Sequence, residues 1–385
     1  MDKEKKTKLE RQLNQEVRRA HISGIIAGAF IGGVETEYIA NGFEKDTIFR
    51  IYSMSKPICA VAIWILIERG CLKLDDPIEQ FLPEYQHIKF FHEGLIVSTK
   101  RSIRVHHLLN MTAGITYDGE DKPGQLVSKL FDRIHEAMDR GEPFNTREVV
   151  KELAKIPLAF EPGTQWRYGL CCDVLGAIIE VVSGKKLGIF YREEIFTPLE
   201  MKDTDFFVPK EKQHRFAPLY QSVIEIGTEK SYLKLDEAHH LGLGKFIEPP
   251  AFESAGAGLV STYKDYVRFA QMLANGGILN GRRLLSRETV EGFMKNPLSK
   301  EQMETLDFEH MMGYGYGNLM RIRLKDTKAR VPGIEKSFGW DGWCGPYVAI
   351  DLEQNSFVLF FLQMSAYADW QLNIRILNAL LFNDI

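Results

Sequence analysis

A hydroxyl and an amine stand three residues apart at the start of the most apolar helix-length run in the chain. The run is FRIYSMSKPICAVAIWILIERG (residues 49–70), and the two groups belong to Ser53 and Lys56. Residues three apart lie on one face of a helix, so the two side chains can reach hydrogen-bonding distance. The positive end of the helix dipole favours a negative charge on the Ser53 oxygen. Burial lowers the pKa of Lys56 by disfavouring its ammonium form, so the pattern predicts a serine that is activated without a histidine.

The spacing alone does not single out this pair, because Ser-x-x-Lys occurs four times. The other three pairs are Ser183/Lys186, Ser231/Lys234 and Ser261/Lys264. The first of these lies at a glycine-containing helix end, the second in a polar segment, and the third where a helix cap accounts for it. Only the pair at residues 53 and 56 opens an apolar helix. The alternative interpretation makes Ser53 a plain N-cap and lets Lys56 extend to solvent.

This segment and several others resemble the motifs of the serine β-lactamase and penicillin-binding-protein superfamily, and they follow one another in the same order as in that superfamily. TIFRIYSMSKP (residues 47–57) is similar to its nucleophile motif, and FEPGTQWRYGLCCDVLGAIIEVVSGK resembles its second motif, whose essential tyrosine is here Tyr168. FGWDGWCG stands where the third motif belongs, before a C-terminal hairpin. SIRVHHLLNMTAGI, AGAGLVSTYKDYVRFAQMLANGG and GYGYG also match in order. The resemblance covers residues 20–380.

This resemblance implies a role for each matching residue. Ser53 would be the acylated nucleophile, and Lys56 the base or proton relay beside it. Tyr168 would share the proton transfers. The backbone N–H groups of Ser53 and Trp343 would form the oxyanion hole.

Two departures from the superfamily pattern bear on the substrate. The second motif usually has asparagine two residues after the tyrosine, but this chain has Leu170. The third motif usually begins with a cation that binds a carboxylate, but this chain has Trp340, Asp341 and Gly342. Both departures resemble the class C β-lactamase-like carboxylesterases (family VIII esterases). These four residues are therefore expected to contact the substrate, an ester with a small or apolar acyl group.

Strand patterns lie at both ends of the chain and helical patterns between them. SGIIAGAFIGG and VETEYIA predict a hairpin at Gly32 and Gly33, and VAIDLEQNSFVLFFLQ predicts another near the C-terminus. The fold class is α+β. The resemblance implies the β-lactamase/transpeptidase-like fold, an antiparallel sheet flanked by helices. Residues 1–75 and 250–385 would form a discontinuous sheet domain, and residues 76–249 an inserted, mainly helical domain.

Charge and composition favour a small-molecule partner. The net charge is −4, with 48 basic and 52 acidic residues mixed along the chain. The sequence therefore has no basic stripe of the kind that binds nucleic acid or a membrane surface. The uncharged run at residues 57–67 is too short to span a bilayer. Oligomeric state is left open.

Cysteine and histidine usage predicts neither disulfides nor metal. The five cysteines include no Cys-x-x-Cys pair, and the charged N-terminus lacks an apolar leader, so a reducing, cytoplasmic location is expected. The pairs His106-His107 and His239-His240 are adjacent in sequence and cannot readily converge on one ion in regular structure. We expect no metal and no cofactor.

Three functions therefore compete. The first is a serine hydrolase that cleaves esters through a Ser53 acyl-enzyme. The second uses the same residues as a β-lactamase, a D-amino-acid peptidase or amidase, or an acyltransferase; the missing leader and missing cation count against its amide-cleaving forms. The third is a catalytically silent binding protein, against which the intact set of Ser53, Lys56 and Tyr168 argues.

Overall fold

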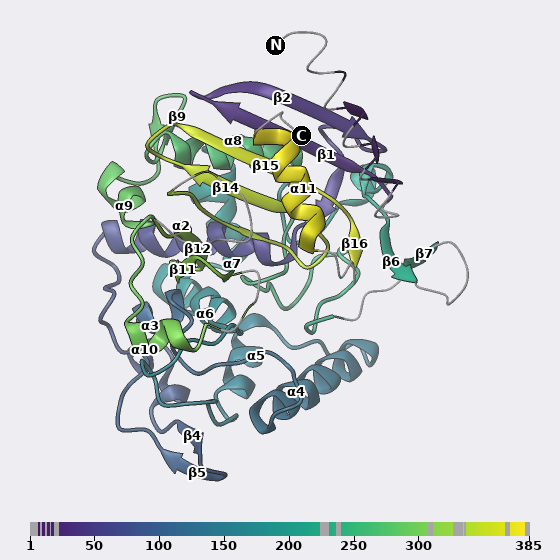
Figure 1. Ribbon diagram of the computed structural model, residues 1–385. Coiled ribbons are helices and arrows are strands. Elements are labelled where there is room, and N and C mark those ends of the chain that lie inside the picture. Colours follow the sequence, from purple (N-terminus) through teal and green to yellow (C-terminus); the bar gives the residue numbers. More distant parts are fainter. Residues whose placement is uncertain are drawn as a thin grey trace.

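The central element is a seven-stranded antiparallel sheet that brings the two ends of the sequence together (Figure 1). The computed structural model describes residues 23–223, 231–235, 240–306, 311–325, 336–365 and 370–381, with scattered residues between 7 and 18 and the single residues 308 and 334. The strand order is β11-β12-β13-β14-β15-β1-β2. The strands are β1 (Ile25–Ile31), β2 (Val34–Asn41), β11 (Tyr314–Gly317), β12 (Met320–Arg323), β13 (Phe338–Asp341), β14 (Tyr347–Asp351) and β15 (Ser356–Phe361).

Both predicted hairpins are confirmed. Strands β1 and β2 turn at Gly32 and Gly33, whose φ angles of 58° and 77° lie in the left-handed region that glycine tolerates. Strands β14 and β15 pair antiparallel, and Asn355 takes a φ of 47° in the turn between them. Strand β1 pairs with β15 over Ile26–Phe361 to Phe30–Phe357, so the first and last strands of the chain are neighbours.

Helices cover both faces of this sheet. Helix α11 lies in front of the sheet in Figure 1, and α8 lies behind it. Helix α8 begins as the sequence predicts, because the Thr262 side chain accepts a hydrogen bond from the Asp265 N–H. The helices outside the middle of the chain are α2 (Ser55–Glu68), α8 (Tyr263–Ala274), α9 (Arg287–Gly292), α10 (Lys300–Glu304) and α11 (Trp370–Leu381).

The middle of the chain is mainly helical, and it lies below the sheet in Figure 1. Helix α6 ends at a left-handed Gly184, as the sequence indicates. The helices are α3 (Val105–Leu109), α4 (Lys122–Asp139), α5 (Thr146–Leu153), α6 (Cys171–Ser183) and α7 (Leu187–Tyr191). The division into a discontinuous sheet domain and residues 76–249 stays a prediction.

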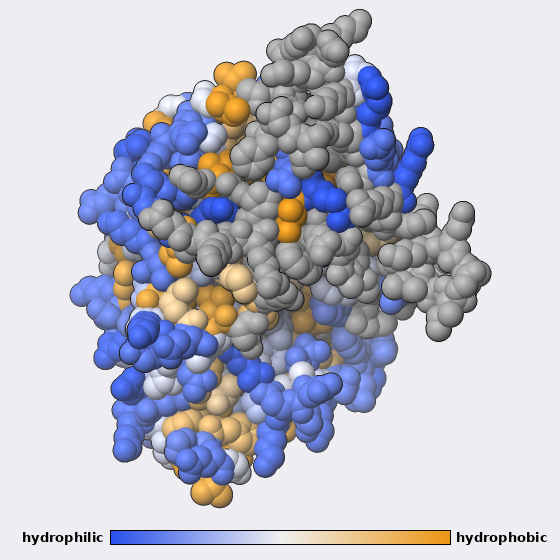
Figure 2. All heavy atoms as spheres, viewed as in Figure 1, coloured by the Kyte–Doolittle hydropathy of each residue, from blue (hydrophilic) through white to orange (hydrophobic). Residues whose placement is uncertain are grey.

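Small sheets complete the fold. They are β3 (Ile48–Arg50) with β8 (Val260–Thr262), β4 (Lys89–His92) with β5 (Leu95–Ser98), β9 (Ile278–Leu279) with β10 (Arg282–Arg283), and β6 (Leu219–Val223) with β7 (Ser231–Leu235) and β16 (Met364–Ser365). The face in Figure 2 is largely hydrophilic where it is coloured, with apolar side chains at the tip of the β4–β5 hairpin, where Leu95 and Ile96 are exposed. None of the helices within the described residues combines the length and apolar character that crossing a membrane requires.

Candidate active site

Ser53 lies in a single 3₁₀ turn, Tyr52–Met54, which runs directly into α2. Tyr52 has a φ of 42°, a backbone conformation that non-glycine residues rarely adopt and that clusters at functional sites. Its buried ring packs against the rings of Trp343 and Phe246, at centroid distances of 5.1 and 5.9 Å. The packing of this ring holds the strained turn in place, and the turn presents Ser53.

Lys56 is fully buried, and its amine is hydrogen-bonded on every side. Nζ donates to Ser53 Oγ at 3.1 Å, to Tyr117 Oη at 3.0 Å and to the Gly256 carbonyl at 2.9 Å. An ammonium group has three N–H donors and no acceptor. The three acceptors therefore match the charged form of Lys56.

The sequence-based expectation for the Lys56 pKa is wrong in direction. Burial does lower this pKa, but the phenol oxygens of Tyr117 and Tyr168 outweigh burial, so the pKa of Lys56 is raised above its ordinary value. The helix sequence gave no indication of these groups, because they come from residues far away in the chain. The direction of this shift and the three hydrogen-bond acceptors both favour the ammonium form of Lys56.

Tyr168 lies just before α6, with its ring 4.8 Å from Lys56 Nζ. Its hydroxyl oxygen accepts a hydrogen bond of 2.9 Å from the indole N–H of Trp340. Burial raises the pKa of Tyr168, whereas Lys56 and hydrogen bonds to Lys56, Ser53 and Trp340 oppose that rise. The net pKa is raised, so the resting side chain is a phenol whose oxygen lies among groups that would stabilise its anion.

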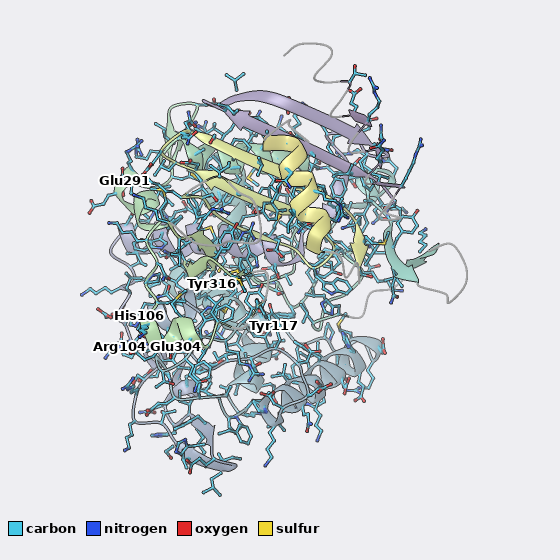
Figure 3. The ribbon with its side chains drawn as sticks, viewed as in Figure 1. Arg104, His106, Tyr117, Glu291, Glu304 and Tyr316 are labelled. Atoms are coloured by element: carbon cyan, nitrogen blue, oxygen red, sulfur yellow. The ribbon has the colours of Figure 1, made fainter. Side chains whose placement is uncertain are left out.

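Sequence reasoning missed Tyr117, which belongs to the same cluster. Figure 3 places Tyr117 between the sheet and the helices below it, and its ring lies 5.4 Å from that of Tyr168. Burial raises the pKa of Tyr117 well above its ordinary value, and the neighbouring ammonium only partly offsets this. No motif draws attention to it, because it is a lone tyrosine in a turn-rich segment.

A buried carboxylate, Asp173, supports the segment that holds Lys56. Asp173 Oδ1 accepts hydrogen bonds from Ser254 Oγ at 2.6 Å and from the Gly256 N–H at 3.2 Å. A Cβ added to Gly256 would lie 3.0 Å from Asp173 Oδ2 and 3.5 Å from Lys56 Nζ. Gly256 therefore lies between the Asp173 carboxyl group and the Lys56 amine, and a side chain there would need Asp173 to shift by a few tenths of an ångström.

The two amides assigned to the oxyanion hole belong to neighbouring segments, because the ring of Trp343, two residues after β13, packs on that of Tyr52 in the nucleophile turn at 5.1 Å. In the part of the chain that the structure describes, neither the Ser53 nor the Trp343 N–H has a hydrogen-bond acceptor. Gly342 allows the close approach, because a Cβ at this position would lie 2.4 Å from the Ile51 carbonyl oxygen. Trp343 is 38% exposed, so this edge of the site is open.

The other residues expected to contact substrate occupy different environments. Trp340 is 2% exposed, and its N–H is bonded to Tyr168. Asp341 lies on the opposite face of β13, where it forms a 2.6 Å ion pair with Arg321. Leu170 is 4% exposed and packs in the hydrophobic core. The structure thus places Trp340 beside the reacting groups, Asp341 in an ion pair on the other face of β13, and Leu170 in the core. Contact of these residues with a substrate stays a prediction.

His240 forms a further part of the site wall. Its ring stacks on that of Trp343 at 4.1 Å and 23°, and burial lowers its pKa. His239 lies outside the described residues, and the rings of His106 and His107 pack edge to face at 4.2 Å. Across the described ranges, no cluster of three or more His, Cys, Asp or Glu side chains is arranged to hold a metal ion.

Comparisons of sequence extend the resemblance to nearly the whole chain. The family model described as Beta-lactamase matches residues 8–377. Protein Rv1367c of Mycobacterium tuberculosis is 30% identical over 331 residues, which are 83% of this chain and 78% of that protein. Esterase EstB of Burkholderia gladioli is 29% identical over 309 residues, covering 78% of this chain and 74% of EstB.

A solved structure gives the same result for the fold. EstCE1, described as a hydrolase with promiscuous acyltransferase activity, superimposes with a TM-score of 0.77 at 22% identity, covering 97% of this chain and 99% of EstCE1. The predicted β-lactamase/transpeptidase-like fold is confirmed. The prediction of a serine hydrolase is confirmed as well, and the chain belongs to the Beta-lactamase family.

Proposed function

We propose that this protein is a carboxylesterase that forms an acyl-enzyme on Ser53. The observation that carries the proposal is the buried Lys56 ammonium, which binds Ser53 Oγ and lies 4.8 Å from the Tyr168 ring. A cation in this position stabilises negative charge on either oxygen at no reorganisation cost. It thereby favours the alkoxide-like serine that attacks a carbonyl carbon.

The proton acceptor in this reaction is the pair formed by Lys56 and Tyr168, after the pair has lost one proton. Lys56 and Tyr168 are coupled, so the singly deprotonated cluster can be written as ammonium with phenolate or as amine with phenol. The raised pKa of Lys56 and the donors around Tyr168 favour the first form. We therefore assign the accepting oxygen to Tyr168, and the role of electrostatic stabiliser to Lys56.

The reaction follows with protons and electron pairs balanced. The Tyr168 phenolate accepts the Ser53 proton while Ser53 Oγ bonds to the ester carbonyl carbon, and the carbonyl oxygen takes the negative charge. The N–H groups of Ser53 and Trp343 stabilise that oxyanion. When the intermediate collapses, the ester C–O bond breaks and Tyr168 returns the proton to the leaving alcohol. Water then attacks the acyl-enzyme by the reverse path, releasing the acid and Ser53.

Esters suit this site better than anionic β-lactams or D-alanyl peptides. The position where the superfamily pattern has a cation is occupied by Trp340, and its single N–H donor is already bonded to Tyr168. It cannot bind a substrate carboxylate as an ammonium would. The name of EstB, an esterase, agrees with this choice.

The test is a substrate panel with wild-type protein and Ser53→Ala. We expect turnover of p-nitrophenyl acetate and butyrate, little of a chromogenic cephalosporin or a D-alanyl peptide, and none of any substrate with Ser53→Ala. Intact-protein mass spectrometry of quenched reactions should detect the acyl group on wild type alone. Ester turnover that survives in Ser53→Ala would place the nucleophile elsewhere. Absence of both turnover and adduct would favour the silent binding protein.

Acyl transfer is a second candidate, favoured by the description of EstCE1. Acyl transfer differs from hydrolysis only in the second step, in which another alcohol, instead of water, attacks the acyl-enzyme. Adding methanol or butanol to the p-nitrophenyl butyrate reaction separates the two, because transfer yields the new ester and hydrolysis yields butyrate.

We also propose a cytoplasmic location. The five free thiols support this proposal, and cell fractionation would test it.

A further inference from the structure

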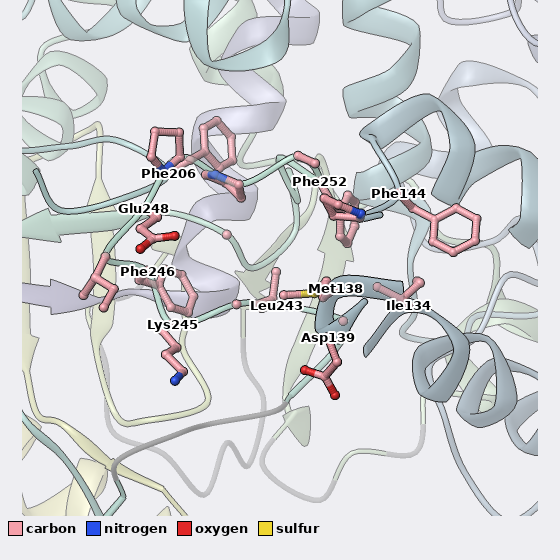
Figure 4. Close-up of a pocket in the computed structure, with 18 of the residues that line it drawn as sticks. Ile134, Met138, Asp139, Phe144, Phe206, Leu243, Lys245, Phe246, Glu248 and Phe252 are labelled. Carbon is pink, nitrogen blue, oxygen red and sulfur yellow. The ribbon is translucent and has the colours of Figure 1, made fainter. Parts of the chain in front are cut away.

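A pocket of about 730 Å³ opens beside the candidate active site. It lies between the C-terminal part of α4, residues 141–144 and residues 242–252 (Figure 4). Its size is typical of sites that bury a small molecule. The main lining side chains are apolar: Ile134, Met138, Phe144, Phe206, Phe246 and Phe252.

The pocket and the candidate active site share two wall segments. Phe246 lines the pocket, and its ring lies 5.9 Å from that of Tyr52, the residue before Ser53. Gly258 also lines the pocket, two residues after the carbonyl that binds Lys56. His240 lies just before residues 242–252. Its carbonyl oxygen accepts a hydrogen bond from the Leu243 N–H, and its ring stacks on that of Trp343. A ligand in the pocket would therefore contact Phe246, whose other neighbour is Tyr52, and the segment that leads to the Gly256 carbonyl.

The charges at the pocket disfavour an anionic ligand. Asp139, Lys245 and Glu248 lie on its exposed margin, which gives two carboxylates and one amine. The buried lining offers large apolar surfaces, among them Phe246 and Phe252 at 6% exposure each. Apolar surface of this kind binds uncharged hydrocarbon groups by removing them from water.

We propose that this pocket binds an extended, uncharged apolar group of the ester, on one side of the bond that is cleaved. The inference rests on the proposed esterase function and makes it more specific. It predicts that the enzyme accepts long-chain or bulky apolar esters as well as small ones. Small esters such as methyl acetate would leave the pocket empty and would be insensitive to its shape.

Two substitutions from opposite walls test the proposal. Met138→Trp and Ala251→Phe each add volume at a half-buried lining position, and Leu126→Trp is the matched control on α4 away from the pocket. We expect either filling variant to lower kcat/KM about tenfold or more for the long ester whose chain enters the pocket, with methyl acetate and the Leu126→Trp variant unaffected. A loss that is larger on p-nitrophenyl octanoate than on p-nitrophenyl acetate assigns the acyl side, and a loss that is larger on octyl acetate than on methyl acetate assigns the alcohol side. Losses that do not depend on chain length in either series, or no loss on either long ester, would overturn the proposal.

A binding measurement separates this proposal from the function on which it rests. The neutral fluorescent probe N-phenyl-1-naphthylamine is titrated into Ser53→Ala protein, with and without Met138→Trp. Saturable binding that weakens about tenfold in the double variant supports an apolar site here, even if no ester is turned over. Absence of binding, or binding that Met138→Trp leaves unchanged, counts against the pocket, even if the short esters are hydrolysed through Ser53.

Discussion

The indole N–H of Trp340 donates a hydrogen bond to the hydroxyl oxygen of Tyr168, with 2.9 Å between nitrogen and oxygen. The side chain that replaces the superfamily's cation thus acts on the tyrosine rather than on a substrate anion. A donor to this oxygen stabilises the phenolate more than the phenol. The departure in the third motif therefore both weakens recognition of anionic substrates and strengthens the proposed base.

Replacing Trp340 with phenylalanine should raise the pKa of Tyr168 further, because the phenolate loses one donor. Hydrogen bonds to charged groups contribute about 1.5–3 kcal/mol, so kcat/KM for p-nitrophenyl butyrate at neutral pH should fall about ten- to hundredfold. Trp166→Phe is the matched control, since Trp166 stacks near Tyr168 at 6.4 Å and its N–H has no hydrogen-bond partner among the described residues. Equal losses in the two variants would indicate a packing effect instead.

Activity should rise with pH through the neutral and alkaline range. The pKa values of Tyr168 and Lys56 are both raised, so the fully protonated cluster dominates at neutral pH. The singly deprotonated form grows as pH increases, and kcat/KM should grow with it until the protein unfolds. A profile measured from pH 6 to 10 checks the sign. A plateau already reached at pH 6 would contradict the assignment, and Tyr168→Phe should remove both the activity and the rise.

Removing the Tyr117 hydroxyl should reduce both activity and stability. In Tyr117→Phe, one N–H of the buried Lys56 ammonium loses its acceptor, which costs about 1–3 kcal/mol in the free energy of unfolding. The pKa of Lys56 should fall, because Tyr117 is among the groups that raise it. Tyr316→Phe is the control, since the Tyr316 hydroxyl is buried without a hydrogen-bond partner in the described part of the chain. Urea unfolding of both variants measures the difference, and similar losses would argue against a special role for Tyr117.

Two substitutions of Asp173 should differ in effect. Asp173→Ala leaves Ser254 Oγ and the Gly256 N–H buried without their acceptor, at about 1–3 kcal/mol for each group. It should also displace the Gly256 carbonyl from Lys56 and lower kcat. Asp173→Asn keeps an acceptor oxygen and should retain most of the stability. If urea unfolding finds the two variants equally unstable, the hydrogen bonds are not what Asp173 contributes.

A methyl group at Gly342 should disturb the oxyanion hole. In Gly342→Ala the new Cβ would meet the Ile51 carbonyl oxygen at 2.4 Å, so the strand end and the nucleophile turn must move apart. A displacement near 1 Å in a catalytic group can cost about a hundredfold in rate, and we expect a loss of this order in kcat. Gly292→Ala is the control, because a Cβ there meets nothing within 4 Å. Full activity in Gly342→Ala would show that this junction is not critical.

The sequence was sufficient for the residues that belong to recognisable motifs. Ser53, Lys56 and Tyr168 carry local signals, namely an apolar helix and a tyrosine before a second helix, and the structure brings them together. The Gly32-Gly33 hairpin and the Thr262 cap were also predictable, because turn and cap chemistry depends on neighbours in sequence.

Properties that depend on distant neighbours were not predictable. The pKa of Lys56 was assigned the wrong direction, since its acceptors come from Tyr117 and Gly256, which no motif links to the nucleophile helix. The motif position of Leu170 likewise gave no indication that its side chain packs in the core at 4% exposure; its contact with substrate stays a prediction. The pocket beside the site depends on residues 242–252, a segment whose irregular sequence predicts no element.

The pairing of β1 with β15 has a consequence for biosynthesis. Ser53 leaves the ribosome early, whereas Trp340, Trp343 and the strand that completes the sheet beside β1 leave it late. Contacts between such distant segments form slowly, and the entropy of closing the intervening loop must be overcome first. A nascent chain interrupted before β13 would thus carry the nucleophile without Trp343, which supplies one of the two proposed oxyanion donors. Enzyme activity would appear only after nearly the whole polypeptide has been translated.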